Sequence, residues 1–166
     1  MEKDRERVRA EERAFRLLTR RAHSEKELRT KLRVGGFSTS AVEETIQRCR
    51  ELGYLDDGSF AVRRARVLAV DRLEGNRRII RDLRSRGIDD ELCRRAVEEA
   101  RRQLGEEEAA ERLLRKRIRG RATAALDERE RARLARGLLG KGFPTALVLK
   151  TLRMTEGYGF HDDDGE

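Results

Sequence analysis

Residues 23–37 have the sequence HSEKELRTKLRVGGF, which contains the start, the buried face and the end of one short helix. Ser24 and Glu27 form a capping box, a pair of side chains that satisfies free backbone N–H groups at a helix start. Leu28 and Leu32 lie one helical turn apart and predict a single apolar stripe. The two glycines that follow predict the end of the helix, because glycine readily adopts the left-handed conformation found there.

The same pattern occurs three times along the chain. A pair of apolar residues four apart is followed by a glycine and another apolar residue, and the occurrences are 51 and then 55 residues apart. The members are Leu28, Leu32 and Gly36-Phe37, then Ile79, Leu83 and Gly87-Ile88, and finally Leu134, Leu138 and Gly142-Phe143. A unit of three helices buries little by itself, so neighbouring units are expected to stack. The sequence therefore predicts an all-α fold of three tandem three-helix repeats, stacked into an elongated, curved body.

The repeat pattern divides the chain into four parts. We expect a first repeat with a charged N-terminal lead-in at 1–55, a second at 56–104, a third at 105–154, and an acidic, disordered tail at 155–166. Each repeat would begin with a longer helix, at about 8–21, 57–73 and 106–119. Gly137 and Gly140 fall inside the third repeat's expected middle helix, where each costs about 1 kcal/mol relative to alanine. The third repeat is therefore expected to be the least rigid.

The chain is strongly charged and basic. It has 40 Lys and Arg against 32 Asp and Glu, a net charge of +8. Five of the acids lie in the tail, which has no Lys or Arg, so the rest of the chain is more cationic than the total. Such a surface suits nucleic acid or an acidic protein. No apolar run is long enough for a membrane span or a secretion signal, so we expect a cytoplasmic protein without membrane contact.

Two clusters of basic residues are candidate contacts for DNA. Residues 63–86 contain nine arginines, and residues 112–121 contain six basic residues and no acid. In the second repeat's middle helix, the arginines lie on the side opposite Ile79 and Leu83. A merely solvated helix face is the alternative, but it would mix in Glu four residues away, and these clusters lack that pattern. The candidate binding residues are Arg63, Arg66, Arg72, Arg77, Arg81, Arg84, Arg112, Arg115, Lys116 and Arg119.

The composition limits how DNA would be bound. The chain has no Trp and two Tyr, so few aromatic rings are available for bases to stack on. We expect the arginines to contact the phosphate backbone of single- or double-stranded DNA, which gives affinity without sequence information.

No group of residues predicts catalysis, a metal site or a cofactor. Asp56 and Asp57 are interpreted as caps of the next helix, with a catalytic acid pair as the alternative. Cys49 and Cys93 lie on apolar stripes and are interpreted as buried small side chains. His161 and the three Asp that follow it could bind a divalent ion weakly, but a solvated tail is the simpler interpretation. We therefore expect a monomeric protein that is not an enzyme and has no cofactor.

Three stretches together resemble a known family. HSEKELRTKL at 23–32, GYLDDGSFA at 53–61 and RGI at 86–88, in this order, resemble the RecX family, regulators of the RecA recombinase. The likeness covers residues 14–100 by specific motifs and the remainder by the repeat pattern alone. It implies a protein that binds RecA and its DNA filament, lies along the filament groove, and restrains filament extension. RecA-dependent recombination, ATP hydrolysis and SOS co-protease activity would then be restrained as well.

Two other functions stay open. The first is a sequence-nonspecific nucleic-acid-binding helical repeat protein with no RecA partner. The second is a nuclease or other metal enzyme that uses Asp56, Asp57 or the tail. Affinity for RecA-coated against naked DNA separates the first from a RecA regulator, and a screen for metal-dependent activity addresses the second.

Overall fold

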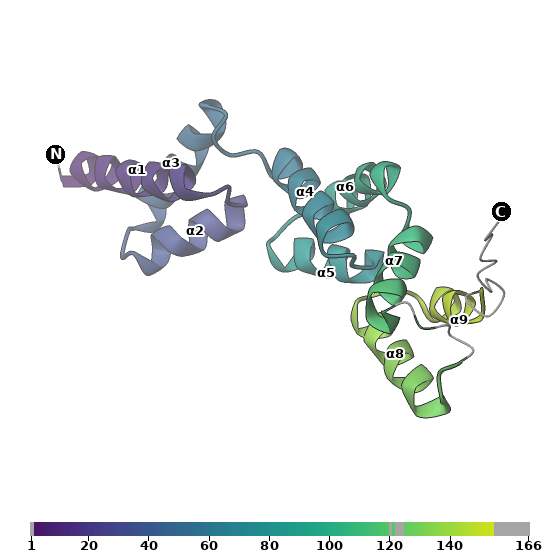
Figure 1. The fold of residues 1–166 in the computed structure, drawn as a ribbon. Helices are drawn as coiled ribbons and strands as arrows, with labels where there is room; N and C mark the ends of the chain where they lie inside the picture. The colour runs from purple at the N-terminus through teal and green to yellow at the C-terminus, as the bar shows by residue number, and fades with distance from the viewer. Residues whose placement is uncertain (1, 120, 122–124, 155–166) are drawn as a thin grey trace, which may run out of the picture. The chain divides into compact units, whose positions relative to one another are not determined.

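The computed structural model describes residues 2–119, 121 and 125–154, and the regular structure within them is entirely helical (Figure 1). This confirms the predicted all-α fold for the described part of the chain. The elements are α1 (Glu2–Arg20), α2 (Glu25–Val34), α3 (Thr39–Glu51), α4 (Asp57–Arg66), a π-helical turn η1 (Val67–Asp71), α5 (Asn76–Ser85), α6 (Asp90–Gln103), α7 (Glu106–Ile118), α8 (Glu128–Gly140) and α9 (Thr145–Met154).

The chain packs as two compact units. Unit 1 consists of residues 1–64 and 82–96, and unit 2 consists of residues 65–81 and the chain from Val97 onward. Helices α4, α5 and α6 each contribute residues to both units. The limits predicted for the three repeats stay a prediction.

Each unit has its own apolar core. In unit 1, α1, α2 and α3 pack around Leu28, Leu32 and Ile46, which are at most 1% exposed. In unit 2, α7, α8 and α9 pack around residues that include Leu138 and Phe143. The predicted apolar stripes are therefore buried in both units.

The three glycine turns have the same backbone geometry. The φ angles of Gly36, Gly87 and Gly142 are 85°, 82° and 89°, which lie in the left-handed region that glycine adopts without strain. In each turn, the apolar residue after the glycine donates its N–H to the carbonyl of the last stripe residue. These bonds are Phe37 to Leu32 at 3.4 Å, Ile88 to Leu83 at 3.2 Å and Phe143 to Leu138 at 3.4 Å. This is the Schellman motif, so one local signal ends α2, α5 and α8.

Some helix limits differ from the sequence prediction. Helix α1 begins at Glu2 instead of near residue 8, because the charged lead-in has no glycine or proline and its Glu6 side chain binds Ser38. Helix α8 is continuous through Gly137 and Gly140. The predicted capping box at the start of α2 is confirmed, since Ser24 and Glu27 each accept from the other's backbone N–H at 3.2 Å.

In unit 1, the start of α2 docks onto α4 and onto the turn after α5. The backbone N–H of Glu25 donates to Oδ1 of Asp57 at 2.8 Å, and the hydroxyl of Ser24 donates to the carbonyl of Arg86 at 2.7 Å. Burial raises the pKa of Asp57. Asp56, its neighbour, instead caps α4 by accepting from the N–H of Ser59 at 3.0 Å. Both acids therefore serve helix starts, although the sequence predicted only a local cap.

In unit 2, the start of α5 docks in the same way onto α7 and onto the turn after α8. The backbone N–H of Asn76 donates to Oε1 of Glu106 at 2.7 Å, and the N–H of Gly75 donates to the carbonyl of Lys141 at 2.8 Å. The two docking sites lie at equivalent places in the repeat pattern, and each unit contains one of them. In each unit, the acid at the start of α4 or α7 and the carbonyl before a turn glycine thus accept hydrogen bonds from the residues that start a short helix.

An ion-pair network surrounds the docking site in unit 1. Asp82 accepts hydrogen bonds from Arg64 at 2.8 and 2.9 Å and from Nε of Arg86 at 2.9 Å. Arg86 also pairs with Glu27, the capping-box acid of α2. The hydrogen bonds from Arg64 and Arg86 lower the pKa of Asp82 to about 2, against the opposing effect of its partial burial.

Gly75→Ala is expected to destabilise the protein by about 1–3 kcal/mol, the usual cost of forcing atoms into a packed site. A Cβ at this position would lie 2.5 Å from the carbonyl oxygen of Gly142 and from the amide nitrogen of Phe143, and both are backbone atoms. Gly140→Ala is the control: the new Cβ would meet no atom of the described chain within 4 Å, and the variant should gain up to about 1 kcal/mol of helix stability. Urea unfolding of both variants checks this, and equal midpoints would contradict the packing at Gly75.

Asp82→Asn is expected to cost about 1–3 kcal/mol at pH 7, because two arginines lose their charged acceptor. A carboxyl with a lowered folded-state pKa stabilises the fold above its ordinary pKa, and that contribution is lost as the pH falls through the folded value. The difference between wild type and variant should therefore narrow as the pH falls from about 4 toward 2. Melting temperatures across this range provide the measurement, and a gap that stays constant with pH would contradict the assignment.

Candidate nucleic-acid interface

The first predicted cluster lies mainly in unit 2. The candidate binding residues of this cluster in unit 2 are Arg66, Arg72, Arg77 and Arg81, and all four side chains are exposed. None of them forms an ion pair with a described residue, although Arg66 donates to Gln103 at 2.9 Å. These arginines are therefore available to an anionic partner.

Helix α5 has the two faces that the sequence predicted, but two of its four arginines have an acid partner, Arg78 in Glu74 at 3.3 Å and Arg84 in Asp90. Ile79 and Leu83 are fully buried, whereas Arg77 and Arg81 are exposed. Arg84, in unit 1, is exposed too, and its Nε lies 2.6 Å from a carboxylate oxygen of Asp90. Arg63, the other predicted residue in unit 1, is exposed.

The second predicted cluster, on α7, is partly neutralised. Arg112 pairs with Glu108 at 2.6 Å, and Arg115 pairs with Glu111 at 3.6 Å. The expectation that this helix lacks acids four residues from its bases was therefore wrong, because the helix begins at Glu106 and its first turns supply them. The two other predicted members, Lys116 and Arg119, are exposed and form no ion pair with described residues. Arg119 lies just past the end of α7 at φ 51°.

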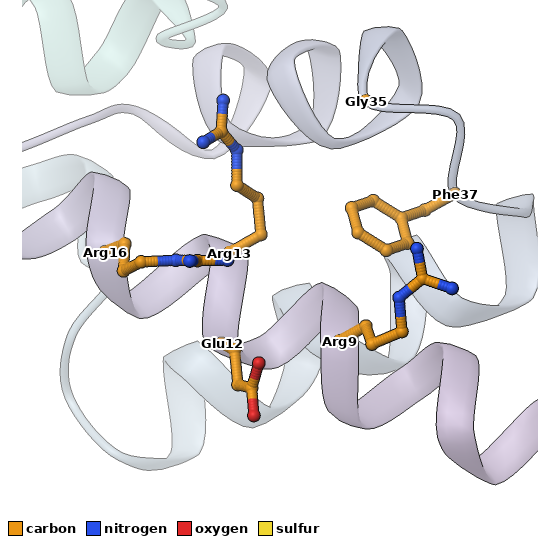
Figure 2. A pocket seen from close by; sticks show the side chains of 6 residues that line it. All are labelled: Arg9, Glu12, Arg13, Arg16, Gly35 and Phe37. Atoms are coloured by element: carbon orange, nitrogen blue, oxygen red, sulfur yellow. The ribbon is translucent and has the colours of Figure 1, made fainter.

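A third group of arginines was not predicted. Arg9, Arg13 and Arg16 of α1 line an open pocket of about 340 Å³ together with Glu12, Gly35 and Phe37 (Figure 2). Their spacing of four and three residues places them on one helix face, and this spacing could have identified them in the sequence. Sequence reasoning missed them because acids are interspersed in this helix.

The remaining reactive groups have structural surroundings. Burial raises the pKa of Cys49 to about 11 and also raises that of Cys93, so both thiols are protonated at neutral pH. Within the described residues, no group of three or more His, Cys, Asp or Glu is arranged to hold a metal ion. His161 and the acidic tail at 155–166 lie outside the described residues. Among the helices of the described chain, none is long and apolar enough to cross a membrane.

Comparison with known proteins identifies the family. A model of the first three-helix domain of RecX matches residues 10–49, and a model of the third three-helix domain matches residues 105–152. The regulatory protein RecX of Syntrophotalea carbinolica is 31% identical over 137 residues, covering 82% of this chain and 90% of that protein. The chain belongs to the RecX family.

Other RecX proteins are similar over nearly the whole chain. The regulatory protein RecX of Thermus thermophilus is 35% identical over 149 residues, which cover 89% of this chain and 94% of that protein. The crystal structure of RecX from Lactobacillus salivarius has a TM-score of 0.77 and 19% identity, and the match covers 92% of this chain and 98% of that one. The helical repeat fold and a regulatory role as a RecX protein follow from these matches.

Replacing both Arg77 and Arg81 by Gln is expected to weaken binding to naked DNA of any sequence. The slope of log K against log salt should become shallower by about 1 for each phosphate that the variant no longer binds. The matched control replaces both Arg112 and Arg115 by Gln. Their charges are already paired with acids, so this variant should change the slope less. Fluorescence anisotropy with one labelled duplex at several salt concentrations measures both, and equal slopes for the two variants would contradict the assignment.

Proposed function

We propose that this protein is a non-enzymatic regulator that binds RecA and its DNA filament and restrains filament extension. Recombination, ATP hydrolysis and SOS co-protease activity by RecA would fall as a consequence. The observation that carries the proposal is membership of the RecX family, with relatives matched over most of both chains. This regulation of RecA would take place in the cytoplasm, where RecA and the chromosome are found.

The exposed arginines support the DNA part of this proposal. Arg77 and Arg81 project from a helix whose opposite face is buried, so they can bind phosphate without disturbing the fold. Arginine forks match phosphate geometry well. Backbone contacts of this kind bind any sequence, as a protein that follows a filament along a chromosome requires.

Three small repeats support binding to a repeating partner. Divided at residues 55/56 and 104/105, they would allow a monomer to make several weak contacts, and linked weak contacts give avidity without any single strong one. No cofactor or metal is needed for such a role.

A sequence-nonspecific nucleic-acid-binding protein without a RecA partner is the second candidate. It is favoured by the same arginines that have no acid partner in the described part of the chain, because they would bind naked DNA equally well. The two candidates differ in whether RecA increases the affinity.

The deciding experiment measures RecA filaments on single-stranded DNA with and without this protein. We expect higher affinity for RecA-coated than for naked DNA at one salt concentration, together with slower filament growth and lower ATP turnover as the protein is added. Equal affinity for coated and naked DNA, with RecA activity reduced only when the DNA is already saturated by this protein, would favour the second candidate.

A further inference from the structure

The turn after α2 has a surface that is covered at the two equivalent turns. A Cβ on Gly87 would lie 2.7 Å from the side chain of Lys26, and one on Gly142 would lie 2.6 Å from Arg78, so a helix start packs against each of these glycines. A Cβ on Gly36 would have no neighbour within 4 Å among the described residues, although the φ angle and hydrogen bonds of this turn match those of the other two. Val34, two residues before Gly36, is 85% exposed. The first turn therefore has the form of a docking site without its helix.

The covered turns show what kind of segment fits. In each unit the occupant is the start of a short helix, held through its first backbone N–H groups. In unit 1 this helix start also carries an acid in its first turn, Glu27, which pairs with Arg86 beside the turn. A helix start with a first-turn carboxylate is thus an observed ligand of this surface within the chain itself.

Positive charge exceeds negative charge beside the turn after α2, and this excess suits a ligand that carries a carboxylate. Arg64, which lies 51 residues after Arg13 in the repeat pattern, pairs with Asp82. In the first repeat, the residue that corresponds to Asp82 is Lys31, so the acid partner is missing there. Arg13 accordingly forms no ion pair with a described residue. Arg9 and Arg16 add further positive charge to the same pocket, and Figure 2 shows the ring of Phe37 facing it.

We propose that the pocket between α1 and the turn at Gly35 to Phe37 binds a helix start with a carboxylate in its first turn, presented by a protein partner. The inference rests on the proposed function, under which the partner is RecA. The carboxylate would pair with Arg13 and Arg16, and apolar atoms of the helix would contact Phe37. Contact with the apolar ring of Phe37 would favour a protein helix over the phosphate backbone of DNA.

The third short helix of this chain does not start at the place in the repeat pattern where α2 and α5 start. The residue of the third pattern that corresponds to Ser24 and Gly75 is Glu130. It lies inside α8, because that helix begins at Glu128 after its own cap at Asp127. Head-to-tail stacking of two copies would therefore not repeat the docking seen within the chain, and the occupant is proposed as a protein partner on the strength of the proposed function.

The test replaces both Arg13 and Arg16 by Glu in the full chain. Lys3→Glu with Arg5→Glu is the matched control, because it makes the same charge change on exposed positions of the same helix outside the pocket. Affinity is measured for RecA filaments on single-stranded DNA and for the same DNA without RecA, at one salt concentration. Should the pocket variant melt below wild type, Arg13→Gln with Arg16→Gln repeats the comparison.

We expect the pocket variant to lose about tenfold or more in affinity for the filament, as when one side of an interfacial charge pair is removed, with the control much less affected. Both variants should bind naked DNA alike. Equal filament affinity of the two variants would overturn the pocket assignment and leave the proposed function standing. A parallel loss on naked DNA by the pocket variant alone would overturn it in favour of phosphate. Wild-type protein that binds filaments no better than naked DNA would overturn both proposals.

Discussion

The free N–H groups at the start of a short helix are the constraint around which this chain is organised. A helix start leaves its first backbone donors without partners, and burying them unpaired is costly. In both units an acid at the first residue of another helix, Asp57 of α4 or Glu106 of α7, accepts one of these N–H groups. The carbonyl before a turn glycine accepts from the Ser24 hydroxyl in unit 1 and from the N–H of Gly75 in unit 2. Docking one helix start therefore fixes three helices at once. This matters in a chain with 43% charged residues, where apolar burial alone is limited.

Arginine has two separate uses in this protein. Some arginines join elements within a unit, as Arg86 does with Asp82 and Glu27, and Arg101 does with the carbonyl of Glu74 at 2.6 Å. Others, such as Arg77 and Arg13, are exposed and have no acid partner among the described residues. The second kind carries both the proposed DNA contacts and the proposed docking pocket.

The sequence could predict what depends on near neighbours in the chain. The capping box at Ser24, the three glycine turns and the stripe residues Leu28 and Leu83 all follow from spacings of a few residues, and the structure agrees. It could not predict that Asp57 receives the N–H of Glu25, since that contact depends on packing between helices 32 residues apart. The partner of Arg84 and the acids that neutralise part of α7 were also missed. Whether an arginine side chain has an acid partner depends on side-chain rotamers and on where each helix begins and ends, and neither can be deduced from composition.

The packing at Gly75 and Gly142 also has a genetic consequence. Every single-base change in a glycine codon that alters the amino acid introduces a residue with a Cβ. At Gly75 that atom would meet backbone on the far side, and at Gly142 it would meet the backbone nitrogen of Arg78, so a flexible side chain cannot simply move aside. No amino acid that a single-base change introduces at Gly75 or Gly142 fits without a shift of the backbone. Such changes at these two sites are therefore expected to cost stability, whereas at Gly140 a Cβ would meet no described residue within 4 Å.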